Sequence, residues 1–333
     1  MLDPFQIRAR GGATVESLLF DRLDAQGTEF TVVDVGARNG MILPQSLARR
    51  SRVVGFEPNP VEYAKLAEHR TDAERAGVPV SHFKAEEYHN CALWRADEVR
   101  PFYVTAGPGA CTLMGKTLGS MTRRIWREGD TKSYESTHTD VRETLPMQCR
   151  RLDSILSPGR KVDLLKLDVE GAEAPVLEGA AGLLAARTVL FVKSEFVFTP
   201  YYEAHPVLGH QHVLLHEHGF RLIDLDLTHP RYTRDRTALP ATADRRLIYA
   251  GDAYFVLDPD RPPLEPEDAY RMAVFCIAFG FRSLAVSLLR DSRRFSEADL
   301  VRIESALASV PWPRRLTNFW NNTPKRVARL LGL

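Results

Sequence analysis

Four acidic side chains lie at or near the ends of short apolar runs in this sequence. Asp34 follows the run TVV, and Glu57 closes the run RVVGF. Asp168 ends the run LLKL, and Glu195 lies near the end of TVLFVKSEF. Runs of β-branched and aliphatic residues are typical of buried strands. The carboxyl ends of parallel strands meet at the edge of an α/β sheet where ligands bind. We therefore expect the four carboxylates to lie around one ligand site.

A turn with two glycines follows the first of these acids. The segment VVDVGARNG, residues 32–40, joins a predicted strand to a stretch with helical spacing. Gly36 and Gly40 flank the turn, and a glycine lets the backbone come close to a ligand. Glu57 follows Gly40 by 17 residues. A carboxylate at the end of a buried strand can accept both hydroxyls of a ribose, so the two segments predict a nucleoside-binding crevice.

The spacing of the glycines distinguishes between the nucleoside cofactors that such a crevice could bind. A dinucleotide fingerprint reads G-x-G-x-x-G, whereas this turn reads D-x-G-x-x-x-G and has no third glycine. Asp34 would place a negative charge at a pyrophosphate, but it would suit a cation such as the ammonium group of S-adenosyl-L-methionine. The turn therefore favours a methyl donor over NAD. A turn with a purely structural role is the third interpretation.

Composition and charge exclude several classes of protein. The chain has 333 residues, is 44% hydrophobic and carries a net charge of +1, so it is globular and has no electrostatic case for nucleic-acid binding. No C-x-x-C pair occurs among its four cysteines, which predicts free thiols in a reducing compartment. The amino-terminal segment MLDPFQIRARGG has no apolar core of a signal peptide. The longest apolar run, residues 272–281, is too short to span a bilayer. We expect a cytoplasmic protein.

Strands and helices alternate through most of the chain, which predicts a parallel sheet with helices on both faces. Strands are expected at residues 30–34, 52–56, 87–94, 99–104, 163–167, 188–196 and 221–227. Helices are expected at residues 14–24, 41–50, 60–76 and 206–220. The segment RRLIYAGDAYFVLD, residues 245–258, predicts a closing hairpin around Gly251 and Asp252.

Three other segments have distinct characters. Residues 107–146 are polar, and we interpret them as a lid or acceptor-recognition loop with one short helix around Trp126. After the linker DPDRPPLEPED, only helical periodicity remains, so residues 1–257 and 258–333 are predicted to be a main domain and a helical C-terminal extension. The tail, residues 312–333, is basic and amphipathic. It is expected either to contact an anionic membrane surface peripherally or to pack on its own domain.

Six segments in this order resemble the FkbM-type family of S-adenosylmethionine-dependent methyltransferases. They are VDVGARNG, GFEPNP, NCAL, RRLDSIL, KLDVEGAE with VLEGA, and the strand that carries Glu195, together covering about residues 30–225. The resemblance implies a class I methyltransferase fold, which is a Rossmann-like α/β fold with a mostly parallel seven-stranded sheet whose last strand is antiparallel. It also implies methylation of hydroxyl groups of sugars, polyketides or other secondary metabolites.

The resemblance assigns residues to the methyl donor S-adenosyl-L-methionine and to its product S-adenosyl-L-homocysteine. Glu57 is implied to bind the ribose hydroxyls, and Asn90 with its neighbours is implied to lie near the adenine. Arg38 is a departure, because the family often has asparagine directly after Gly-Ala. The residues implied to line the methionine and ribose part of the donor are Asp34, Gly36, Ala37 and Gly40.

Methyl transfer to a hydroxyl needs a base, because an alcohol is a poor nucleophile. Asp168 and Glu195 are the candidates nearest the acceptor, with Glu173 and Lys193 as weaker ones. Each acid also has a structural interpretation: a helix N-terminal charge for Asp168 and Glu173, and a salt bridge for Glu195.

Histidines are a second source of candidate ligands and bases. His212 and His216 could share a helix face and hold a metal. No carboxylate completes that pattern, however, so a solvated helix end and no metal site are expected. His138, in the long loop, is a further candidate base.

The leading hypothesis is an O-methyltransferase acting on a sugar, glycan or secondary-metabolite acceptor. A nucleotide-dependent oxidoreductase is disfavoured by Asp34 and the missing glycine. A nucleic-acid N-methyltransferase would usually show Asn/Asp-Pro-Pro-aromatic where this chain has Asp168-Val-Glu-Gly. A non-catalytic donor-binding scaffold remains the non-enzyme alternative. The expected partner is a small molecule or glycan rather than nucleic acid, and a homo-oligomer is compatible with the sequence.

Overall fold

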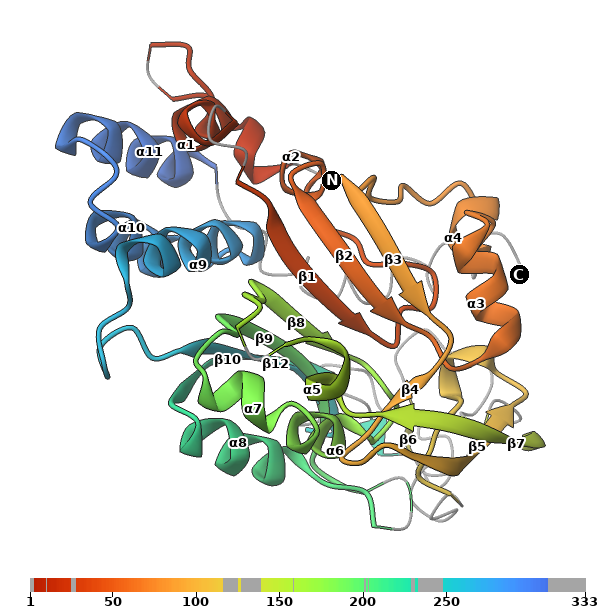
Figure 1. Ribbon diagram of the computed structural model, residues 1–333. Coiled ribbons are helices and arrows are strands. Elements are labelled where there is room, and N and C mark those ends of the chain that lie inside the picture. Colours follow the sequence, from red (N-terminus) through yellow and green to blue (C-terminus); the bar gives the residue numbers. More distant parts are fainter. Residues whose placement is uncertain are drawn as a thin grey trace.

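The computed structural model describes most of the chain (Figure 1). The described residues are 3–9, 11–24, 28–115, 125–126, 139–157, 159–200, 202, 204–228, 231–232 and 248–310. The tail at 312–333, His138 and most of the predicted 107–146 loop therefore lie outside the described residues.

A seven-stranded sheet forms the centre of the fold (Figure 1). β1, β2, β3, β8 and β9 pair in parallel, and β12 runs antiparallel to both of its neighbours. This confirms the predicted fold class, a mostly parallel seven-stranded sheet with an antiparallel last strand. Its order is β10 (Phe220–Thr228), β12 (Ala250–Leu257), β9 (Phe191–Val197), β8 (Leu164–Leu167), β1 (Phe30–Val35), β2 (Ser51–Phe56) and β3 (Ala85–His89).

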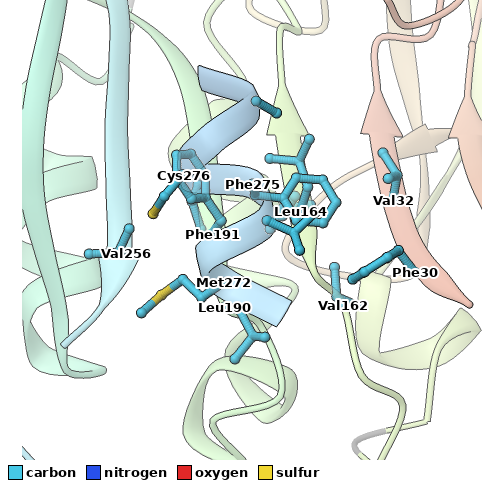
Figure 2. Packing of buried hydrophobic residues seen from close by; sticks show 14 of the residues in the cluster. Phe30, Val32, Val162, Leu164, Leu190, Phe191, Val256, Met272, Phe275 and Cys276 are labelled. Atoms are coloured by element: carbon cyan, nitrogen blue, oxygen red, sulfur yellow. The ribbon is translucent and has the colours of Figure 1, made fainter. Parts of the chain in front are cut away.

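Helix α9 (Pro266–Phe279) covers one face of this sheet. Figure 2 shows Met272, Phe275 and Cys276 of this helix packed against Phe30 of β1 and Phe191 of β9. All five side chains are fully buried or nearly so, so α9 belongs to the same hydrophobic core as the sheet. The predicted division at residues 257 and 258 therefore does not separate two cores, although the helical character of the following segment is as expected.

A buried ion pair ties α9 to the sheet. Arg271 donates from Nε and Nη2 to the two carboxylate oxygens of Asp163, at 2.6 and 2.7 Å. Asp163 also accepts a bond from the backbone nitrogen of Thr31 at 2.7 Å. This arrangement joins three segments distant in sequence at the amino-terminal edge of the sheet.

The remaining helices complete the two outer layers. α10 (Arg282–Asp291) packs on α9, and α11 (Glu297–Ser309) packs on α10 and on α1 (Val15–Asp24). α6 (Glu173–Glu178) and α7 (Ala181–Ala185) lie with α8 (Leu208–Glu217) in front of β8 to β10 (Figure 1). No helix in the described ranges is long and apolar enough to cross a membrane.

A second, three-stranded sheet includes part of the region that was expected to be a loop. Its order is β4 (Ala92–Leu93), β7 (Val141–Arg150) and β5 (Glu98–Thr105). Residues 141–146 are therefore strand rather than loop, because they pair with β5 in antiparallel register. The helix expected around Trp126 is also wrong: Ile125–Trp126 is a short strand, β6, paired with β11 (Arg231–Tyr232).

Two of the predicted helices are shorter in the structure than expected. The helix expected at 60–76 is two helices, α3 (Pro60–Ala67) and α4 (Asp72–Arg75), because Thr71 begins a new helix with a capping box. The helix expected at 41–50 is only α2 (Gln45–Ala48), which starts after Pro44.

The hairpin expected around Gly251 is instead the start of the continuous strand β12. A Cβ at Gly251 would lie 2.1 Å from the carbonyl oxygen of Asp226 on β10. The glycine therefore permits the close approach of a neighbouring strand and does not form a turn.

Candidate active site

A pocket opens at the carboxyl edge of β1, β2, β8 and β9. Gly36, Gly40, Glu57 and Asp168 line it, as the sequence predicts. Its further lining includes Arg38, Asn39, Cys91, Ala92, Leu93, Phe102, Pro108, Gly109, Cys111, Thr112, Leu113, Lys166, Glu170, Lys193 and Phe279. One wall is thus apolar, and the wall at the strand ends carries charges of both signs.

The glycine turn is shaped by its neighbours. Gly36 has φ +82°, and a Cβ there would lie 2.0 Å from the carbonyl oxygen of Asp168. The backbone nitrogens of Gly36 and Ala37 both donate to the carbonyl of Phe56 at 3.0 Å, which holds the turn on β2. Ala37 is fully buried and is absent from the pocket lining. It therefore supports the turn from below instead of contacting a donor as expected.

Asp34 lies beneath the pocket and not on its wall. Its residue is 1% exposed, and the ammonium of Lys166, which does line the pocket, is 3.0 Å from its Oδ1. Burial raises the pKa of Asp34, and the charge of Lys166 opposes that rise. Asp34 therefore faces the ammonium of Lys166 and does not line the pocket, where it was expected to contact the donor.

Glu57 stands at the end of β2 on the pocket wall. Its Oε1 accepts a hydrogen bond from the backbone nitrogen of Asn59 at 2.8 Å. Burial raises the pKa of Glu57 to about 7. Asn90 donates from Nδ2 to the carbonyls of Glu57 and Pro58, at 2.9 and 3.1 Å. Asn90 thus positions the Glu57 loop, while its neighbours Cys91 to Leu93 line the pocket in its place.

Loop residues after β5 close the pocket from the other side. Thr112 donates from Oγ1 to the carbonyl of Glu170 at 2.8 Å. Cys111 accepts weak hydrogen bonds at its Sγ from Asn59 and from the backbone of Thr105, at 3.7 and 3.5 Å. These contacts place residues 107–115, the first part of the predicted lid, against both the Glu57 loop and the β8 edge.

Acidic side chains gather at the ends of β8 and β9. Asp168, Glu170 and Glu195 each have a carboxylate oxygen within 4.8 Å of those of the other two. The side chain of Asp168 is half exposed, and its Oδ2 is 3.5 Å from the ammonium of Lys166. Glu195 does not line the pocket itself. The predicted proximity of Asp168 and Glu195 is therefore observed, and of the two only Asp168 lines the pocket.

Glu173 has a structural position. It is 2% exposed, and its Oε1 accepts hydrogen bonds from the backbone nitrogens of Val169 and Gly171 at 2.9 and 3.3 Å. Burial raises its pKa. Its carboxylate is therefore directed to the turn between β8 and α6 and not to the pocket, which corrects its candidacy as a catalytic group.

None of the histidines in the described part of the chain lines the pocket. His212 and His216 are exposed on α8, as expected, with ring centroids 6.3 Å apart. His205, which the sequence analysis did not single out, is buried beside Gly171, and burial lowers its pKa to about 4. It is neutral at physiological pH.

Lys166 and Lys193 are charged residues of the pocket lining that sequence reasoning passed over or ranked low. They are register partners on β8 and β9, and Lys193 forms a buried ion pair with Asp252 at 2.8 Å. The signal for Lys166 was available, since a charged residue interrupts the apolar run LLKL. A lysine in a buried strand requires charged partners.

The residues of the pocket fit the chemistry of S-adenosyl-L-methionine. Asn39 lines it and has a buried Oδ1 with no hydrogen-bond partner among the described residues, and Glu57 provides a carboxylate for ribose hydroxyls. The side chains of Leu93, Phe102 and Leu113 provide apolar surface for the adenine ring of this donor. Acids at the strand ends suit a sulfonium cation.

Comparison with known proteins gives one family. The family model described as the methyltransferase FkbM domain matches residues 34–222, more than half of the chain. A comparison with curated proteins finds no match.

Solved structures show distant similarity to the chain. Magnesium protoporphyrin IX methyltransferase from Synechocystis PCC 6803, with bound S-adenosyl-L-methionine, is 12% identical, with 73% of this chain and 76% of that chain covered at a TM-score of 0.30. A putative S-adenosylmethionine-dependent methyltransferase from Listeria monocytogenes is 8% identical, with 72% and 97% covered at a TM-score of 0.32. A putative tRNA methyltransferase from Streptococcus pneumoniae is 11% identical, with 92% and 97% covered at a TM-score of 0.31.

Proposed function

Because the chain belongs to the FkbM family of methyltransferases, we propose that it transfers a methyl group from S-adenosyl-L-methionine to a hydroxyl oxygen. The proposed acceptor is a sugar, glycan or secondary metabolite, and the second product is S-adenosyl-L-homocysteine. The observation that carries the proposal is that Glu57 and the acids that follow β8, Asp168 and Glu170, line one pocket.

The donor is already activated, so the protein has mainly to orient the acceptor and take its proton. We assign to Asp168 the role of the base that accepts this proton, because its half-exposed carboxylate lines the pocket at the strand edge. The acceptor oxygen attacks the methyl carbon, the carbon–sulfur bond breaks, and its electron pair stays on sulfur. The oxygen's proton passes to the Asp168 carboxylate. Glu195 is the second candidate for the base, because one of its carboxylate oxygens lies within 4.8 Å of a carboxylate oxygen of Asp168.

The donor half of the proposal is tested by titration calorimetry with S-adenosyl-L-methionine, S-adenosyl-L-homocysteine and NAD. Binding of the first two without NAD supports a methyltransferase. Tight NAD binding without donor binding would support the oxidoreductase alternative and refute the proposal.

The acceptor half needs a reaction. The protein is incubated with donor labelled in its methyl group and with an extract of cell-surface glycans, and the products are analysed by mass spectrometry. Label on a hydroxyl oxygen supports the proposal, and label on nitrogen or carbon contradicts it. Donor binding without any transfer to this extract or to a panel of secondary metabolites would favour the non-catalytic scaffold.

A further inference from the structure

Lys166 contacts residues on β1, in the glycine turn and at the end of β8. Its ammonium lies 3.0 Å from Oδ1 of Asp34 on β1 and 3.5 Å from Oδ2 of Asp168 at the end of its own strand. It also donates a hydrogen bond to the carbonyl oxygen of Gly36 at 3.0 Å. One cation therefore contacts the strand before the glycine turn, the turn itself and the acid on the acceptor side.

The surrounding elements leave Lys166 little freedom. Its side chain is 15% exposed, and β8 lies between β1 and β9 in the sheet. The register partner on β9 is Lys193, whose like charge disfavours movement of the ammonium toward β9. The carbonyl oxygen of Asp168 fills the space beside the α-carbon of Gly36, so the donor turn and the acceptor-side acid are already in contact through the backbone.

We propose that Lys166 is a positioning residue that fixes the carboxylate of Asp168 relative to the glycine turn, and hence the base relative to the donor methyl group. The inference rests on the proposed function of Asp168. Lys166 touches neither the transferred methyl group nor the proton in this scheme. It acts through Asp168 and Gly36, and Asp34 holds its ammonium from below.

A double-mutant cycle on kcat tests this role. The variants are Lys166→Met, Asp168→Asn and the two combined, all measured at saturating donor. Lys166→Met is expected to lower kcat about 10²-fold, since a misplacement of about 1 Å can have that effect. Asp168→Asn should lower kcat by about 10²–10⁴ in the wild-type chain, but about tenfold less when Lys166 is already absent.

Lys161→Met is the matched control. Lys161 precedes the first residue of β8 by three positions, at the opposite end of the strand from Asp168, and forms a partly buried ion pair with Asp268 at 2.7 Å. It should leave kcat unchanged. A lysine with only a structural role would give effects of Lys166→Met and Asp168→Asn that multiply, and this result would overturn the proposal. Wild-type kcat in Lys166→Met would also overturn it.

Loss of Lys166 leaves Asp34 buried without its cation, so the single variant can fail to fold. The cycle is then repeated in the background Asp34→Asn/Lys166→Met, which removes both charges and keeps side chains of similar size. The proposal is supported if adding Asp168→Asn to this background lowers kcat by a smaller factor than it does in the wild-type chain. An equal factor in the two backgrounds refutes it. Failure of the proposed function would appear separately, as absence of transfer by the wild-type protein.

Discussion

The carbonyl oxygen of Asp168 occupies the position that a side chain at Gly36 would need, 2.0 Å from the site of its Cβ. Gly36→Ala should therefore separate β8 from the glycine turn, and we expect loss of donor binding by calorimetry together with a lower melting temperature. Gly77→Ala is the control, because Gly77 also has a positive φ of +68° but has no atom within 4 Å of its Cβ position. Its cost should be about 1–2 kcal/mol of backbone strain with unchanged donor binding. Equal donor affinity in Gly36→Ala would contradict this account.

Glu57→Gln should weaken donor binding by about 1.5–3 kcal/mol, because a hydrogen bond to a charged acceptor is lost. With a pKa of about 7 in the folded protein, the wild-type carboxylate takes up a proton as the pH falls below 7. Donor affinity of the wild type should therefore decrease from pH 8 to pH 6, whereas that of Glu57→Gln should stay flat. Calorimetry across this range measures both, and a flat wild-type profile would show that the ionised carboxylate is not required.

Glu57→Gln should weaken donor binding, but it should stabilise the folded protein at pH 8. The folded-state pKa of Glu57 is raised above its value of 4.5 in an unfolded chain, so the folded state binds more protons between pH 4.5 and about 7. Stability from this group is lost as pH rises through that window, and Glu57→Gln should melt higher than wild type at pH 8. Glu62→Gln, which removes a charge paired with Arg38 and Lys65, should instead melt lower. A lower melting temperature for Glu57→Gln at pH 8 would refute the burial argument.

Asp168→Asn should lower kcat by about 10²–10⁴ with little loss of donor affinity, because it removes the proposed base. Initial rates at saturating donor and acceptor measure the effect. Glu178→Gln, an exposed acid on α6 paired with Arg95, serves as the control and should react at the wild-type rate. Should Asp168→Asn also react at that rate, Asp168 is not the base and Glu195→Gln is tested next.

Breaking the Asp163–Arg271 pair should destabilise the fold by about 3–5 kcal/mol, because either single substitution leaves a buried charge without its partner. Asp163→Asn and Arg271→Met are compared by urea unfolding, and the double variant should recover much of the loss. Arg221→Met, which removes an exposed pair with Asp258, should cost about 1 kcal/mol or less. A small effect of both single variants would mean that α9 is held by its apolar contacts alone.

The basic tail, residues 312–333, remains a prediction from the sequence. Peripheral contact with an anionic membrane, through the tail's basic residues with Phe319 and Trp320, predicts that the full-length protein floats with anionic liposomes while a chain truncated after Val310 stays in the dense fraction. Equal retention of the two proteins in the dense fraction would favour a tail that packs on its own domain.

Local pattern was sufficient for the sheet and for the donor turn. β-branched runs at 30–34 and 52–56 predicted strands within a residue or two, because a strand buried on both faces must be apolar throughout. Gly36 and Glu57 were placed correctly, because strand ends at one edge of a parallel sheet are adjacent whatever the rest of the chain does.

Only the tertiary structure decided which charged groups line the pocket and which lie behind its lining. Asp34 and Lys166 are register partners on neighbouring strands, yet the ammonium reaches the pocket and the carboxylate does not. The sequence of each strand shows a charge but does not reveal its partner, because pairing between strands is set by sheet order. Likewise, the apolar run of α9 indicates a buried helix, but its place against the sheet follows from Phe30, Phe191 and Phe275 coming together across 245 residues of chain.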